Sequence, residues 1–455
     1  MFTLLNESLF FPALGENCLL RKPRQVPNSD ESAGSASFQR CAEFLGCKQD
    51  ATMIQRMAVA HCTQVPYAMA SEASSVVLPY INSAVGGNVQ TFAQMQAVTS
   101  MVQFLGGLVF GQTADSFGTR WALLTAHGAA MGSAFLVATA YSQKALFLAL
   151  MPLTMAHGFQ ASSQIAVHCS DTERRPVALG RMSATYGLGF FGGTLATAWA
   201  AQRLTPRQIA WAAVALEASV IGTVLVGYPN GDSQKGEVTL SLPGFKEILQ
   251  RPHVLSLVLS KLATATAGGM LLTMIPQFAM DPFGLSAAQT SLLMAYVSGL
   301  QLVAQTFLVP QLGDLGPRSL RMVSNAAVLG PLLGLSVLGT SPKAYCALVG
   351  PLVAVAYAGS TAQGSLMSCL SPESESGAMV ALSTAPLSLG FLVSPLMAGW
   401  VYQRFGFRMV PAMAAAMLFC MAASIEIMEG EEKDAEEEEF GSLEEVCPED
   451  AELVA

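Results

Sequence analysis

Two ionisable side chains stand inside otherwise apolar stretches of the chain. Glu72 shares its stretch with Gln64 and Ser71, and at 100° per residue these side chains fall on one half of a helix. Lys261 lies in a second stretch, on a face shared with small residues such as Gly268. A charge in such surroundings must pair, face water or lose its proton. Glu72, Lys261, Gln64 and Ser71 are therefore candidates for binding a solute or a coupling proton, the alternative being structural pairs.

Three further features bear on the chemistry. His157 falls in the middle of another apolar stretch and could titrate near neutral pH, although a hydrogen-bonded structural histidine is the favoured interpretation. Glu217 is expected to face a neighbouring helix or to pair with an arginine. The nine cysteines form no C-x-x-C pair, so the sequence predicts neither a disulfide framework nor a metal site. No phosphate-binding loop of the GxxxxGK[ST] type occurs, and no cofactor is expected.

The composition indicates the class of protein that holds these groups. Charged residues make up 12% of the 455 residues and apolar residues 52%, whereas soluble domains carry about 25% charged residues. The net charge of −9 comes from residues 429–455, which alone contribute −12, so the rest of the chain is slightly basic. These figures exclude most soluble proteins, give no sign of a nucleic-acid partner, and favour an all-α protein with many membrane-spanning helices.

The apolar stretches predict twelve spanning helices, because a span needs about 20 mostly apolar residues. The expected ranges are 54–80, 91–112, 120–140, 145–168, 178–201, 208–228, 253–279, 287–311, 320–340, 344–369, 377–401 and 408–428.

The longest polar gap divides these helices into two groups of six. Residues 54–228 are expected to form an N-terminal half and residues 253–428 a C-terminal half, joined by a linker over 229–252 whose segment 244–250 could form a short surface helix. Residues 1–53 are expected to form a polar, disordered extension, and the acidic tail at 429–455 to be disordered because its like charges repel. Nine basic residues lie in the loops on one side and six on the other, which places both termini in the cytosol.

A loop motif occurs once in each half. The segment GQTADSFGTR, 111–120, follows the second expected helix, and QLGDLGPRSLR, 311–321, follows the eighth. Each carries Gly, Asp, Gly and Arg in the same order, and glycine permits a tight turn while Asp and Arg can pair with neighbouring helix ends. The candidates for conformational gating are Gly111, Asp115, Gly118, Arg120, Asp314 and Arg318.

This loop resembles the G-x-x-x-D-x-x-G-x-R motif of the major facilitator superfamily. A closer resemblance, to its organic-cation-transporter-like and tetracycline-transporter-like solute carrier branch, is carried by four stretches: VVLPYI at 76–81, the segments 102–123 and 174–193, and LSKLATATAGGMLLTMI at 259–275. The resemblance extends over about 57–410. It implies alternating-access transport of a small organic solute, with proton-coupled antiport, and places Glu72 and Lys261 in a central cavity.

Two departures from the antiporter pattern weaken the implication of proton antiport. The fourth expected helix carries Met151 and no arginine where that pattern has one, and the glycine-rich segment 186–193 contains no proline. Gly189 and Gly193 keep the small-xxx-small spacing, and with Gly192 they are expected to serve helix packing.

We therefore predict a secondary transporter with the twelve-helix major facilitator fold. It would sit in a lipid bilayer, bind a small molecule between its two halves and act as a monomer. Coupling to protons, uniport and symport remain open, as does a receptor or scaffold on the same fold. An enzyme is not expected.

Overall fold

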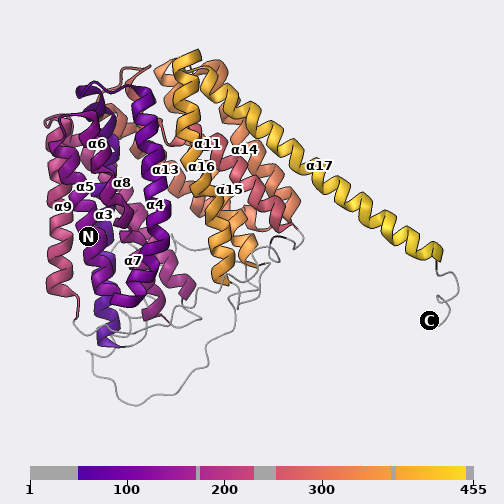
Figure 1. Cartoon of the computed structure of the whole chain (residues 1–455), viewed down its shortest axis with the longest axis horizontal. Helices are drawn as coiled ribbons and strands as arrows, with labels where there is room; N and C mark the ends of the chain where they lie inside the picture. Colours follow the sequence, from indigo (N-terminus) through magenta and orange to yellow (C-terminus); the bar gives the residue numbers. More distant parts are fainter. Residues whose placement is uncertain are drawn as a thin grey trace.

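The computed structural model describes residues 50–170, 175–229, 249, 253–339, 341–369 and 376–446. Within these ranges every regular element is a helix, and Figure 1 shows the helices gathered in one bundle from which the last helix projects. The extension before residue 50, the segment 244–250 apart from Leu249, and residues 447–455 lie outside the described residues, as does nearly all of the linker.

The N-terminal half contains the first six of the twelve expected helices. They are α3 (Ala51–Ala84), α4 (Val89–Phe117), α5 (Thr119–Thr139), the segment α6 (Gln143–Ala149), η1 (Met151–Met155) and α7 (Gly158–Cys169), then α8 (Arg175–Ala200) and α9 (Pro206–Gly227).

The C-terminal half contains the other six. They are the pair α11 (Val254–Leu272) and α12 (Ile275–Met280), then α13 (Ala287–Gly313), α14 (Pro317–Leu338), α15 (Pro342–Cys369), α16 (Ser376–Phe405) and α17 (Met409–Val446). The prediction of an all-helical fold is confirmed for the described residues, which contain a helix or a broken helix at each of the twelve predicted positions.

Two helices that were expected to be continuous are interrupted. The fourth breaks into α6, a 3₁₀ turn and α7, and the seventh breaks between α11 and α12. Pro152 and Pro276 lie at the start of the following segments, where proline has no N–H to continue the preceding helix. His157 was expected in mid-helix; it instead precedes α7 as the N-cap residue, outside the helix.

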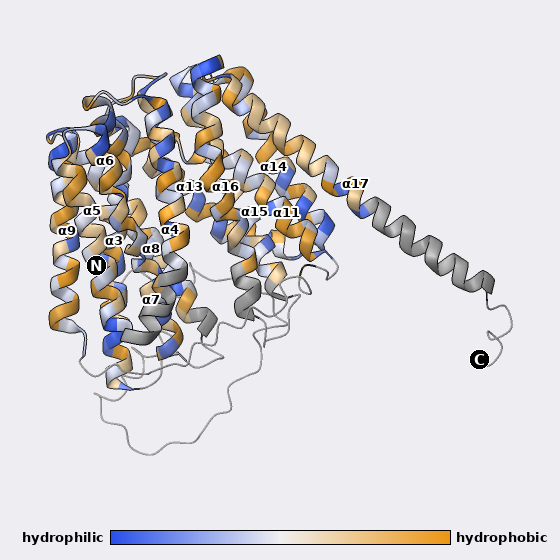
Figure 2. Cartoon of the chain, viewed as in Figure 1, coloured by the Kyte–Doolittle hydropathy of each residue, from blue (hydrophilic) through white to orange (hydrophobic). Residues whose placement is uncertain are grey.

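The helix surfaces fit a lipid environment. Nine helical segments in the described part of the chain are long and apolar enough to cross a membrane. Figure 2 shows apolar residues along the outward sides of helices such as α5 and α9, and hydrophilic residues at their ends. The four tryptophans are all exposed, and tryptophan typically marks the membrane–water interface. They are Trp121, Trp199, Trp211 and Trp400.

The two halves are joined at the end of the bundle where α3 ends and α4 begins. Val76, Val89 and Phe92 from the N-terminal half belong to the same buried apolar cluster as Met274 and Phe278 of the C-terminal half. The hydroxyl of Tyr80 in α3 donates to the carbonyl oxygen of Leu285, at 2.7 Å, and lies 2.6 Å from the Thr290 hydroxyl. At this end the structure is therefore closed between the halves. Below, we call it the joined end.

The opposite end of the C-terminal half contains a buried ion cluster. Arg321 in α14 is 0% exposed and bonds Glu426 at 2.6 Å and Glu429 at 2.5 Å, both in α17, and also Ser256 in α11 at 2.9 Å. One guanidinium therefore joins three helices, since its five donors can serve several acceptors at once.

Helix α17 continues to Val446, so the disorder expected from residue 429 onward is wrong for the backbone of 429–446. Glutamate, which makes up half of this segment, is a good helix former, and the last turns extend a helix that is already nucleated and held by Arg321. Figure 1 shows this part of α17 leading away from the bundle.

Glycines allow α8 to approach α3 closely. A Cβ atom at Gly189 would lie 2.7 Å from the carbonyl oxygen of Val65, and one at Gly193 would lie 2.6 Å from the Cα of Met69. Gly192, which was expected to share this packing, instead faces open space with nothing within 4 Å of such an atom. The close approach therefore depends on Gly189 and Gly193.

We predict that Gly189→Ala lowers the stability of the protein by about 1–3 kcal/mol, because the new methyl group collides with backbone atoms that cannot turn aside. Gly192→Ala is the matched control and should change stability little, since its methyl group meets no atom. The measurement is the thermal unfolding midpoint of each purified variant in detergent. Equal midpoints for the two variants would contradict the packing role of Gly189.

We further predict that Arg321→Met costs about 3 kcal/mol of stability, because two carboxylates lose the guanidinium that neutralises them. Arg318 provides the control. It bonds the same Glu426 at 3.0 Å but is 59% exposed, so Arg318→Met should cost only about 0–1 kcal/mol. Denaturation of both variants in the same detergent checks this, and a larger loss for Arg318→Met would refute the assignment.

Candidate functional site

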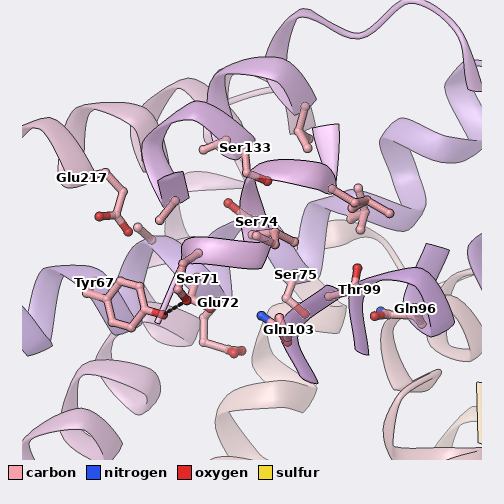
Figure 3. A pocket seen from close by; sticks show the side chains of 18 residues that line it. Tyr67, Ser71, Glu72, Ser74, Ser75, Gln96, Thr99, Gln103, Ser133 and Glu217 are labelled. Carbon is pink, nitrogen blue, oxygen red and sulfur yellow. Dashed lines mark hydrogen bonds between the residues drawn. The ribbon is translucent and has the colours of Figure 1, made fainter. Parts of the chain in front are cut away.

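A cavity of about 230 Å³ lies among the helices of the N-terminal half. Its walls come from α3, α4, α5, α9 and the interrupted fourth helix. The polar residues that line it are Tyr67, Ser71, Glu72, Ser74, Ser75, Gln96, Thr99, Gln103, Ser133 and Glu217 (Figure 3). Among the described residues on its wall, the two charged ones are both acidic.

Glu72 lies on the α3 wall of this cavity. It is 5% exposed, and its Oε2 atom has no hydrogen-bond partner among the described residues. All the residues that line the cavity belong to the N-terminal half.

Glu217 in α9 is held from the side by a histidine. Its Oε2 lies 3.1 Å from Nδ1 of His127 in α5, and both side chains are buried. The ring of Tyr67 stands edge-on to His127, with 5.1 Å between the centroids. Glu217 therefore pairs with histidine and not with the arginine named as one alternative in the sequence analysis. The sequence does not single out His127 as the partner of Glu217.

Gln64 and Ser71, the other candidates on α3, have different surroundings. Ser71 lies on the cavity wall. Gln64 is fully buried, and its Nε2 donates to the carbonyl oxygen of Gly158 at 3.1 Å and to the Ser162 hydroxyl at 2.5 Å. Gln64 thus fastens α3 to α7, while its Oε1 atom has no partner within the described residues.

The interrupted fourth helix exposes backbone groups beside the cavity. The carbonyl oxygen of Ala149 accepts from Ser133 at 2.7 Å, and that of Ala156 accepts from Tyr67 at 3.2 Å. His157 follows directly, with its Nε2 3.1 Å from the carbonyl oxygen of Thr154 and its ring 5.3 Å from that of Phe110. The ring of His157 is engaged locally, whereas the two carbonyl groups accept from Ser133 and Tyr67, which both line the cavity.

Lys261 lies in the C-terminal half, apart from this cavity. It is 2% exposed, and its Nζ donates to the Ser383 hydroxyl of α16 at 2.7 Å. In the described part of the chain, the structure gives it a hydroxyl partner and no carboxylate. Neighbouring residues continue this polar interior, since Ser260 donates to Asn325 at 3.1 Å and Gln363 donates to Ser260 at 3.5 Å.

The two loop motifs occupy equivalent positions in the halves. Arg120 donates to the carbonyl oxygen of Leu225, at 3.2 Å, near the end of α9. Arg318 bonds Glu426 in α17. Each arginine thus contacts the last helix of its own half, which agrees with an internal repeat. In this conformation, neither of these contacts links one half to the other.

The remaining gating candidates are loop and helix-end residues. Gly118 has φ of 87° at the N-cap position of α5, a conformation that favours glycine. Asp314 is exposed at the end of α13. Gly111 and Asp115 lie in a part of α4 whose side chains are not among those described.

Comparison with known proteins agrees with this architecture. The profile of the Major Facilitator Superfamily matches residues 61–371 and 257–444. Solute carrier family 22 member 18 of Rattus norvegicus is 27% identical over 347 residues, covering 72% of this chain and 83% of the relative. Solute carrier family 67 member A1 of Homo sapiens is 28% identical over 350 residues, covering 72% and 82%.

A solved structure extends the match to the fold. The crystal structure of nucleoside transporter NupG superposes with a TM-score of 0.65 at 12% identity, covering 82% of this chain and 98% of that one. The repeated halves, the spanning helices, the superfamily profile and the solute carrier relatives agree. The chain belongs to the major facilitator superfamily, and is a multi-pass membrane transporter.

Proposed function

We propose that the protein is a secondary active transporter that moves a small organic solute by alternating access. The observation that carries this proposal is the cavity beside Glu72, a buried carboxylate whose Oε2 atom has no hydrogen-bond partner in the described part of the chain. Such a group in a membrane interior is costly unless it serves a function. The closed contact at the joined end supports the second part, because alternating access requires a state sealed on one side.

The proposed solute site lies at the boundary of the halves, with Glu72 and Ser71 on one side and Lys261 on the other. We propose that both termini lie in the cytosol and that the protein functions as a monomer. The motif loops at 111–120 and 311–321 would act as gating elements that contribute differently to the two states. Proton antiport, proton symport and uniport are the three modes, and the direction of a solute-dependent pH change inside vesicles separates them. Antiport moves protons against the solute, symport moves them with it, and uniport leaves the pH unchanged.

The test of the function begins with a thermal-shift screen of the purified protein against small solutes, since a specific ligand stabilises the folded state. Solutes that stabilise it are then radiolabelled and offered to proteoliposomes. We expect saturable uptake that an unlabelled excess of the same solute suppresses. Specific binding without uptake would instead identify a receptor on the same fold.

We predict that Lys261→Ala abolishes uptake in folded protein, and that Lys261→Arg also impairs it. A guanidinium is bulkier than an ammonium group and does not release a proton, so it cannot replace a lysine that serves a solute or a proton. The measurement is the uptake rate per folded molecule. Near-normal uptake by Lys261→Arg, with lowered stability of Lys261→Ala, would make Lys261 a structural residue.

We also predict that Tyr80→Phe opens the joined end more often. The variant loses hydrogen bonds between the halves, each worth about 1 kcal/mol, so the open population should rise several-fold. Spin labels at the exposed positions Ser83 and Lys343, one in each half, report the separation.

Tyr402→Phe is the control for this experiment. Its hydroxyl bonds Asp281 within the same half, so its loss leaves the contact between the halves intact. The same distance distribution in Tyr80→Phe and in the unchanged protein would show that Tyr80 does not hold this end closed.

A further inference from the structure

A short sequence pattern occurs once in each half and has no part in the proposed transport cycle. The segments WAAQRLTPR, 199–207, and WVYQRFGFR, 400–408, share the pattern W-x-x-Q-R-x-x-x-R. The first connects α8 to α9 and the second connects α16 to α17, so each copy joins the fifth and sixth spanning positions of its half, at the joined end. The equivalent places and the shared residue types indicate that the two copies serve the same purpose.

The last arginine of each copy fixes the connection to the bundle. Arg207 donates from Nη1 to the carbonyl oxygen of Ala138 in the last turn of α5, at 3.2 Å. Arg408 donates from Nη2 to the carbonyl oxygen of Val337 in the last turn of α14, at 3.3 Å. Each therefore binds the third spanning helix of its own half, which is a structural role.

The first arginine of each copy has no such partner. Arg203 and Arg404 are exposed, and none of the carboxylates in the described part of the chain pairs with either of them. The Arg203 guanidinium lies over the ring of Trp199, 4.5 Å from its centroid. Such stacking uses the face of the guanidinium and leaves the N–H donors in its plane available to bind a phosphate group bidentately.

The tryptophan of each copy lies on the outer surface of a spanning helix, near the end of that helix. Trp199 in α8 is 62% exposed, and Trp400 in α16 is 54% exposed. Trp400 also meets the exposed ring of Phe405 edge-on, with 5.8 Å between the centroids. Tryptophans in such positions lie at the level of the lipid headgroups. The neighbouring arginine of each copy is therefore held beside headgroups.

The joined end as a whole is basic. Its connections and the adjoining helix turns contain six basic residues among those described, and one acidic residue, Asp281, whose carboxylate accepts from Tyr402. The six are Lys144, Arg203, Arg207, Lys343, Arg404 and Arg408. A basic surface at the level of the headgroups attracts anionic lipids more strongly than zwitterionic ones, because each cation adds to the attraction.

We propose that the two copies are binding sites for the phosphate group of an anionic membrane phospholipid, one on each half. The first arginine binds the phosphate, the tryptophan packs against the upper part of the lipid, and the last arginine holds the connection in place. An acidic protein in solution fits less well, because the tryptophans hold the arginines at the depth of the headgroups. The inference does not depend on the proposed function, since it concerns lipid and not the transported solute.

The experiment counts lipids bound to the full-length protein by native mass spectrometry from detergent. Dioleoylphosphatidylglycerol is titrated into delipidated protein, and dioleoylphosphatidylcholine is titrated in a parallel series. We expect two phosphatidylglycerol molecules to bind about fivefold more tightly than phosphatidylcholine. Equal binding of the two lipids would refute recognition of an anionic headgroup.

Substitutions assign the sites. Arg203→Gln and Arg404→Gln should each remove one of the two tightly bound lipids, and the double variant should remove both. Both arginines are exposed, so the variants should fold, and an unchanged thermal unfolding midpoint checks this. Lys144→Gln and Lys343→Gln are the matched controls. They remove the same charge at the same end but outside the repeated pattern, and they should retain both lipids.

Three results would overturn the proposal. The first is retention of both lipids by the double arginine variant. The second is an equal loss of lipid in the double arginine variant and in the double lysine variant, which would reduce the effect to the general charge of this end. The third is binding of a hexaglutamate peptide that depends on the two arginines, without a preference for phosphatidylglycerol, which would assign the arginines to an acidic protein partner.

Discussion

Glu72, a buried carboxylate whose Oε2 atom has no hydrogen-bond partner among the described residues, is the constraint around which the N-terminal half is arranged. Placing such a group in the interior of a membrane protein is costly unless water, a cation or a proton reaches it. The serines before and after Glu72 on α3 and the polar residues of α4 line the same cavity, so the space that Glu72 borders is partly polar. The polar lining of the cavity is therefore consistent with a carboxylate on its wall.

The rest of the fold holds the walls of the cavity in place. Gln64 fastens α3 to α7, His127 fastens α5 to α9, and Gly189 lets α8 pack closely on α3. In the C-terminal half, Arg321 joins α11, α14 and α17. Each half is thus held together by side-chain contacts of its own. The contact of Tyr80 with Leu285 and Thr290 lies on that boundary.

The positions of the helices could be predicted from the sequence because apolar length alone largely determines where a chain crosses a membrane. The two breaks could not. Pro152 and Pro276 begin the segments after the breaks, yet Pro386 and Pro395 lie inside the unbroken α16. Whether a proline ends a helix depends on the neighbouring helices that satisfy the freed backbone groups, which local sequence does not report.

The same limit applies to the site. Glu72 and Ser71 could be recognised because a polar side chain in an apolar run is conspicuous. Gln96, Thr99 and Gln103 carried a readable signal, since their spacing of three and four residues puts them on one helix face. The pairing of His127 with Glu217 joins residues 90 positions apart, and only the packing of α5 on α9 creates it.

The accessibility of the cavity from the two sides of the membrane tests the central claim most directly. A single cysteine at Ser75, on a cysteine-free background, is exposed in proteoliposomes to a membrane-impermeant thiol reagent added outside or trapped inside. Alternating access predicts modification from both sides. It also predicts loss of modification from the side of the joined end in a second variant, in which two further cysteines at positions 83 and 343 are cross-linked beforehand to hold that end shut. Modification from one side only, with or without the cross-link, would contradict the account.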